Sequence, residues 1–100
     1  MSEPLHTPTW LTAAVDQRLA FFNEMAGHGR PIPGIDVIMM SLTEPPPNAT
    51  QEDFIRWDHS CDNCGKVFPM DLRCGAVNRI VNGQRAHITF GCCDECARLP

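Results

Sequence analysis

The 100-residue sequence is short of three features that would place it in a well-defined class of proteins. It has no apolar run near the ~20 residues that a membrane-spanning helix needs, and it carries Glu3 where a secretion signal has Lys or Arg. We therefore expect a soluble, cytoplasmic protein. It also has few aromatic residues: no tyrosine, five phenylalanines and two tryptophans. A lobe of about 40 residues would therefore need a bound metal ion or disulfide bonds to stabilise it besides its apolar core.

Positive charge is also scarce. Twelve acidic residues stand against eight basic ones, and the net charge of −4 argues against a general nucleic-acid binder. The balance changes along the chain, because residues 1–58 sum to −5 whereas residues 59–100 sum to +1 and hold all six cysteines. We therefore expect an acidic region over 1–58 and a separate metal-binding lobe over 59–100.

The acidic region is predicted to be helical. Near its start, apolar residues recur three and four positions apart, which is typical of one buried helix face. These residues are Trp10, Leu11, Ala14, Val15, Leu19, Phe22 and Ala26. We expect helices near 8–26 and 51–58, the second opened by a capping box of Thr50 and Asp53.

The segment 35–43 is ambiguous. It is rich in Ile, Val and Met, and its length suits a buried strand as well as a helix. We favour a helix because Ile35, Ile38, Met39 and Leu42 follow the helical spacing. Three prolines from Pro45 then end this element.

The cysteines form two pairs with the same spacing. Cys61 and Cys64 make one C-x-x-C, followed by Gly65, and Cys93 and Cys96 make a second. In a reducing compartment this pattern indicates metal binding rather than disulfides. Two such turns facing each other supply four thiolates in a tetrahedron, which Zn²⁺ prefers, although iron would accept the same ligands. The sequence therefore predicts one zinc ion per chain.

Three further residues are alternate ligands. Cys92 lies next to Cys93 and could replace it, while Cys74 and His59 could supply a ligand from elsewhere in the lobe. For Cys74 we favour a buried apolar role, and for His59 a role outside the metal site.

Between the cysteine pairs, Asn82-Gly83 predicts a two-residue hairpin turn. Closing the hairpin there places Val81 opposite Gln84 and Val77 opposite Ile88. A cysteine turn, a hairpin and a second cysteine pair resemble the treble-clef and zinc-ribbon group of zinc fingers, over residues 59–100. The resemblance covers the zinc-stabilised hairpin lobe, and together with the small helical N-terminal part expected over 1–58 it predicts an α+β fold. It implies no activity, because many unrelated functions share these folds.

We expect no enzymatic activity and no catalytic residues, since four thiolates leave a zinc ion no open position for water. Two binding functions remain. The favoured one is a regulatory or accessory role through an unidentified protein partner or self-association. The residues predicted for it are Trp10, Phe21, Phe22, Met39 and Met40. The alternative is nucleic-acid binding through Lys66, Arg73, Arg79 and Arg85, which the −2 charge of a four-thiolate zinc site disfavours.

Overall fold

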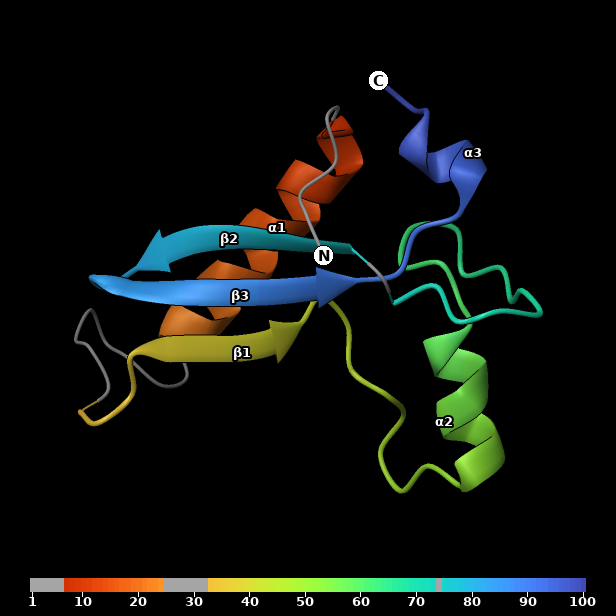
Figure 1. Cartoon of the computed structure of the whole chain (residues 1–100), viewed down its shortest axis with the longest axis horizontal. Helices are drawn as coiled ribbons and strands as arrows, with labels where there is room; N and C mark the ends of the chain where they lie inside the picture. The colour runs from red at the N-terminus through yellow and green to blue at the C-terminus, as the bar shows by residue number, and fades with distance from the viewer. Residues whose placement is uncertain (1–6, 25–32, 74) are drawn as a thin grey trace.

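The computed structural model describes residues 7–24, 33–73 and 75–100. Its elements are α1 (Thr9–Phe22), β1 (Val37–Ser41), α2 (Gln51–Asp58), β2 (Gly75–Val81), β3 (Gln84–Phe90) and α3 (Asp94–Ala97). The fold is thus α+β, as predicted, with one three-stranded sheet (Figure 1). No helix within these ranges is long and apolar enough to cross a membrane.

The hairpin of β2 and β3 forms in the predicted register. Val81 pairs with Gln84 and Val77 with Ile88, around a turn in which Asn82 and Gly83 have φ angles of 53° and 78°. Positive φ at both central residues is what a type I′ turn requires, so Asn-Gly alone determines where the hairpin closes.

The prediction of a helix over 35–43 is wrong, because Val37–Ser41 forms strand β1. This strand lies parallel to β3, with Val37 beside Arg85 and Ser41 beside Thr89, so the strand order is β1-β3-β2. Ile38 is buried and Met39 is exposed, which follows the two-residue period of a strand. The backbone of β3, nearly 50 residues later in the chain, supplies the hydrogen bonds that make the strand favourable.

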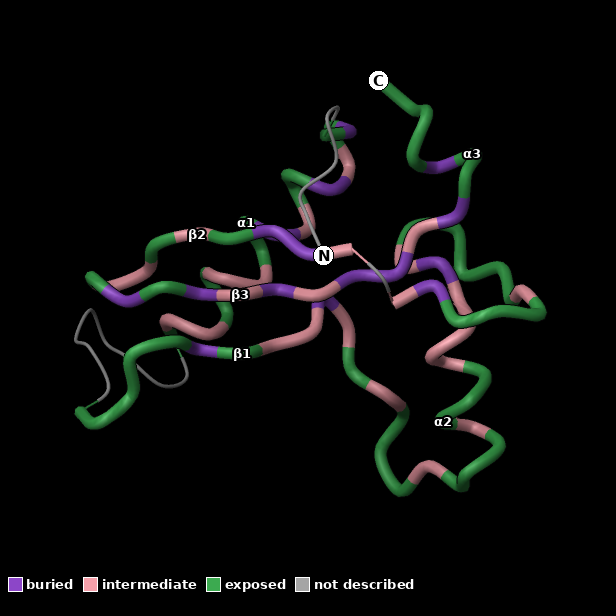
Figure 2. The backbone as a smooth tube through the Cα atoms, in the orientation of Figure 1, coloured by how far each residue is buried: buried purple, intermediate pink, exposed green. Residues whose placement is uncertain are grey.

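Helix α1 covers one face of the sheet and forms the main core with it (Figure 1). Its Leu11 and Val15 are fully buried against Val77, Ile88 and Phe90, and the buried stretch of β3 runs along the middle of the fold (Figure 2). The α-helical part runs to Phe22, and Asn23 and Glu24 continue it as a π-helical turn. Residues 25 and 26, the last two of the range predicted to be helical, lie outside the described part of the chain.

The core joins both sides of the expected boundary at residue 58. Leu11, Val15 and Leu42 share it with residues of the hairpin, and β1 belongs to the same sheet as β2 and β3. The region after residue 58 therefore has an apolar core in common with the helical part. The segments that carry the two C-x-x-C pairs, after α2 and between β3 and α3, lie at the end of the sheet where β3 leads into α3 (Figure 1).

Candidate metal centre and binding surfaces

The first cysteine pair lies in a tight turn between α2 and β2. The Cys61 N–H donates to the Lys66 carbonyl at 3.0 Å, and the Gly65 N–H donates to the Cys61 carbonyl at 2.9 Å. Gly65 has φ +75°, a conformation that favours glycine, as its place after the second cysteine predicts. The turn aims the thiols of Cys61 and Cys64 to one side.

The second pair follows β3 at the start of α3. Cys93 precedes the helix as its N-cap residue, and Cys96 lies in its single turn. Gly91 fastens this segment to the first turn, because its carbonyl accepts from the Asp62 N–H at 2.9 Å. A Cβ at Gly91 would lie 2.8 Å from the Ser60 carbonyl oxygen, so this close approach requires glycine.

The four predicted ligands, Cys61, Cys64, Cys93 and Cys96, are the residues that the structure brings together. Their sulfur atoms all lie within 4.8 Å of one another, and the Cys64 and Cys93 sulfurs are 3.9 Å apart. Four sulfurs at about 2.3 Å from one metal ion would be about 3.8 Å apart, whereas a disulfide needs about 2 Å. The arrangement indicates a metal site, with zinc as a plausible ion, and is compatible with a zinc-finger-like fold.

The electrostatics of the cluster also favour a cation. Burial raises the pKa of Cys61, but N–H groups of Cys64, Cys93 and Asn63 aimed at its sulfur lower that pKa to about 7. The Asn63 amide donates to the Cys96 sulfur at 3.3 Å, yet burial and the neighbouring thiols raise the pKa of Cys96 to about 12. The protein alone stabilises only part of the negative charge, and a divalent ion would stabilise the rest.

The alternate ligands lie elsewhere or outside the described residues. The Cys92 thiol donates to the Cys93 carbonyl at 3.3 Å, and burial followed by the nearby thiols raises the pKa of Cys92 to about 12. Nδ1 of His59 lies 3.2 Å from the Phe68 carbonyl oxygen, and His59 is outside the sulfur cluster. Cys74 is outside the described part of the chain.

A buried ion pair beside the cluster was not found from the sequence. Asp62, between the first two ligands, binds Arg73 at 2.7 Å, and their side chains are 1% and 7% exposed. The Asp62 carboxylate also accepts from the Gly91 N–H at 2.9 Å and from the Thr43 hydroxyl at 2.7 Å. These bonds tie the first cysteine turn to the segments after β1 and β3.

The Arg73 guanidinium, in a side chain only 7% exposed, is held by the same network. It lies 4.0 Å from the centre of the Trp57 ring and donates to the Trp57 carbonyl at 3.2 Å. The Trp57 indole N–H in turn donates to Thr43 at 3.0 Å. Arg73 therefore holds the metal-binding turn in place, with its guanidinium paired to Asp62 rather than directed to the solvent.

The other basic residues of the nucleic-acid alternative are spread over the lobe. The Lys66 ammonium lies 5.7 Å from the centre of the Phe68 ring, and Arg79 donates to the Asn78 carbonyl at 2.8 Å. Arg85 is exposed in the middle strand β3.

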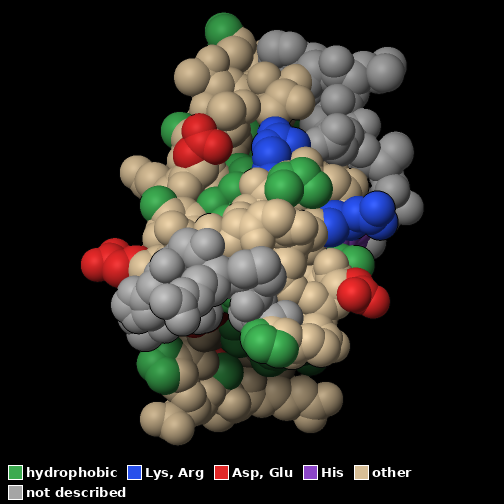
Figure 3. All heavy atoms as spheres, turned by 90° about the vertical axis from the view of Figure 1, so that its left-hand side faces the viewer, with side chains coloured by type: hydrophobic (Ala, Val, Ile, Leu, Met, Phe, Trp, Pro, Cys, Tyr) green, Lys and Arg blue, Asp and Glu red, His purple; other side chains and the backbone are tan. Residues whose placement is uncertain are grey.

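Four of the five residues predicted to bind a protein line one groove. Phe21 and Phe22 of α1 face Met39 and Met40 of β1 around a hollow of about 240 Å³. Phe21 is 54% exposed and Met39 68%, whereas Phe22 and Met40 are half-buried. Figure 3 views the end of the sheet where β1 begins. On this face, hydrophobic side chains are scattered among single acidic and basic side chains.

Trp10, the fifth, belongs to the interior. Its indole N–H donates to the Cys96 carbonyl at 2.9 Å, and its ring packs against both the sheet core and the cysteine cluster. Its role is to connect α1 to the metal-binding end of the molecule.

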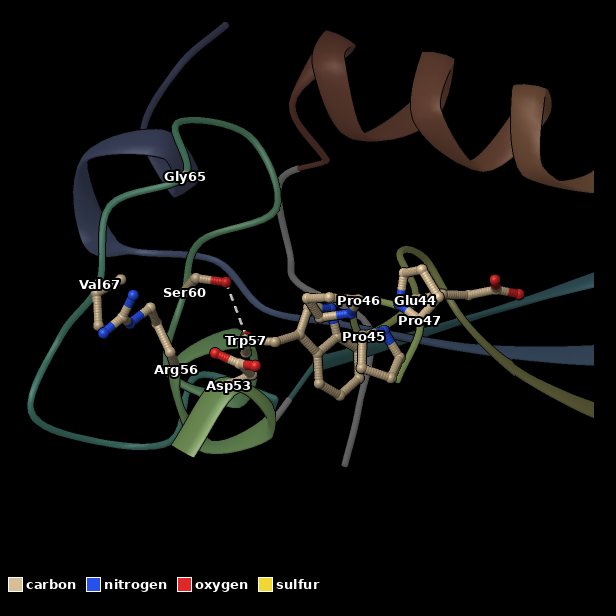
Figure 4. A pocket seen from close by; sticks show the side chains of 10 residues that line it. All are labelled: Glu44, Pro45, Pro46, Pro47, Asp53, Arg56, Trp57, Ser60, Gly65 and Val67. Carbon is tan, nitrogen blue, oxygen red and sulfur yellow. Dashed lines mark hydrogen bonds between the residues drawn. The ribbon is translucent and has the colours of Figure 1, made fainter. Parts of the chain in front are cut away.

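A larger hollow, about 590 Å³, lies between the triproline segment and α2 (Figure 4). Prolines 45–47 lie beside Trp57 there, while Arg56 and Val67 lie at the opposite side. Ser60 lines this hollow, and its hydroxyl donates to the Trp57 carbonyl at 2.7 Å. The hollow therefore offers no activated nucleophile at Ser60.

Comparison of the chain with protein-family models, curated proteins and solved structures found no match.

Proposed function

We propose that this chain is a non-enzymatic accessory protein that binds another polypeptide in the groove between α1 and β1, with a structural zinc ion stabilising its C-terminal end. The observation that carries the proposal is the convergence of Phe21, Phe22, Met39 and Met40 on that groove. Met and Phe side chains adapt to different apolar partners, and their exposure in a small protein favours contact with another surface.

The zinc assignment rests on the donor set. Four thiolates in a tetrahedron suit Zn²⁺ and leave no position for a reacting water, which supports a structural role. The order of a cysteine turn, a hairpin and a ligand pair at the start of a helix supports a treble-clef type of finger over a zinc ribbon. The four residues of α3 make its final helix shorter than that type usually has.

Selection of extended peptides from a random displayed library on the metal-loaded chain tests the binding function. We expect enrichment of peptides with apolar residues at alternate positions, and we expect Phe21→Asp to lower their affinity at least about tenfold, because it places a charge in an apolar groove. Ile55→Asp, at a residue 47% exposed on α2 and outside the groove, is the control. Peptides that bind both variants equally would contradict this function.

The nucleic-acid alternative makes a separate prediction. If Lys66, Arg79 and Arg85 contact phosphates, mixed DNA and RNA fragments should bind at low salt, and the binding should weaken steeply as salt is raised. We expect no such binding, because a zinc-loaded lobe carries a net negative charge and Arg73 forms a buried ion pair with Asp62. A mobility shift that disappears with salt and with Arg85→Ala would overturn the preference for a protein partner.

A further inference from the structure

Strand β1 forms one edge of the sheet, and its outward backbone groups can be identified. The Leu42 N–H donates to the Thr89 carbonyl at 2.8 Å, and Ser41 is the register partner of Thr89. In a parallel ladder, every second residue directs both its N–H and its C=O to the neighbouring strand. Leu42, Met40 and Ile38 therefore bond to β3, whereas Val37, Met39 and Ser41 direct their backbone groups away from it. No described strand pairs with β1 on that outer side.

This edge carries none of the side chains that usually keep an edge strand from pairing. The sequence of β1, VIMMS, contains no charged residue, no proline and no glycine. Its outward residues include Met39, which is 68% exposed, and Val37, which is 36% exposed. An uncharged, apolar strand with free N–H and C=O groups is chemically suited to another strand rather than to a helix or a small molecule.

From this geometry we infer that the edge of β1 binds a second copy of this chain, strand to strand and antiparallel, about a two-fold axis at Met39. The inference rests on the proposed binding function, for which it names the partner. With Met39 on the axis, its N–H and C=O bond to those of Met39 in the second copy, and Val37 bonds to Ser41 there. Every outward group of the three residues then has a partner, which is the condition for a self-complementary interface.

The charges around the edge support a second copy. The protein carries a net charge of −4, so two copies repel one another unless they meet on a neutral surface. The groove beside β1 is such a surface, because Arg18, the one cation among the described residues that line it, forms an ion pair with Glu44 at 2.7 Å. In the paired arrangement Met40 of one copy lies across from Ile38 of the other, on the side of the sheet where α1 and the groove lie.

Sedimentation of the metal-loaded chain over a range from about 1 to about 500 µM tests this inference. A short strand pair with a small apolar groove falls at the low end of interface sizes, and we expect a dimer with a dissociation constant on the order of 10 µM. Met39→Pro removes an outward N–H and leaves the bonds from Ile38 and Met40 to β3 intact, so the fold should survive. We expect it to weaken dimerisation about 10- to 100-fold.

Met39→Lys provides a second variant, because two ammonium groups would then meet at the axis. The matched control is Ile80→Lys, at a residue 71% exposed on β2, at the opposite edge of the sheet. We expect Met39→Lys to weaken the dimer and Ile80→Lys to leave it unchanged. Metal content and circular dichroism confirm that each variant is folded.

Amide hydrogen exchange identifies the paired edge directly. The amides of Val37, Met39 and Ser41 should exchange more slowly as the concentration rises, whereas those of Ile38 and Met40 should be protected at every concentration. The inference would be overturned if the chain stays monomeric to about 500 µM, or if it dimerises and neither Met39 variant changes the dissociation constant. If the monomeric chain still selects peptides that depend on Phe21, the proposed binding function stands and only the second copy is excluded.

Discussion

Replacing Cys93 by serine should release the metal and unfold the end of the molecule that holds α3, whereas the same change at Cys92 should do neither. Cys93 contributes a sulfur to the cluster, while the Cys92 thiol is turned to the Cys93 carbonyl. Structural zinc in small fingers contributes about 10–16 kcal/mol of apparent binding free energy, and a whole domain is stable by about 5–15 kcal/mol. Loss of the metal therefore removes a contribution as large as the stability of the domain.

Metal analysis and thermal unfolding of the two variants, beside the unmodified chain, measure this effect. We expect about one metal ion per chain for the unmodified protein and for Cys92→Ser, and a metal affinity lower by more than about 100-fold for Cys93→Ser. Residual structure in Cys93→Ser should be confined to α1 and the sheet, whose core of Leu11, Val15 and Ile88 does not include the ligands. A chain that keeps its full structure in excess chelator would refute a structural metal.

Breaking the buried pair of Asp62 and Arg73 should have the second largest effect. Either Asp62→Ala or Arg73→Ala leaves the other charge without its partner in a site where both side chains are almost inaccessible to water. Removing one member of a buried ion pair costs about 3–5 kcal/mol, which for a chain of this size lowers the Tm by roughly 15–30 °C. The metal-binding turn should loosen as well, because the Asp62 carboxylate also receives the Gly91 N–H.

An exposed ion pair of the same chain provides the control. Arg56 lies 3.7 Å from Glu52 on the surface of α2, with side chains 66% and 84% exposed. Arg56→Ala should change stability by at most about 0.5 kcal/mol, because water screens such pairs. In a double-mutant cycle, Asp62→Ala and Arg73→Ala together should cost less than the sum of the single changes. Additive effects would show that the two side chains act separately.

Several features could be predicted from the sequence because they depend on neighbours along the chain. The Asn82-Gly83 turn determined the hairpin register, and the capping box of Thr50 and Asp53 formed at the start of α2 as expected. The spacing of the cysteine pairs and the glycine at position 65 indicated the metal-binding turn. In each case, residues within a few positions of one another supply both the geometry and its partners.

Strand β1 shows where such reasoning failed. The spacing of Ile38 and Leu42 fits a helix and a strand alike over so short a segment, and the parallel edge of β3 decided between them. The change of composition at residue 58 likewise does not reveal that β1 and α1 share a core with the hairpin.

The sequence by itself thus determined the metal-binding cysteine pairs up to the choice between Cys92 and Cys93, the hairpin and the helix face of α1, all of which follow from local spacing and turn chemistry. Tertiary structure alone decided that Cys93 rather than Cys92 joins the cluster, that the Trp10 indole bonds to Cys96, and that Arg73 binds Asp62. It also placed Phe21 beside Met39 at the groove. The physical reason is that burial and pairing depend on segments far apart in the chain, which meet only when the sheet, its apolar core and the cysteine cluster form.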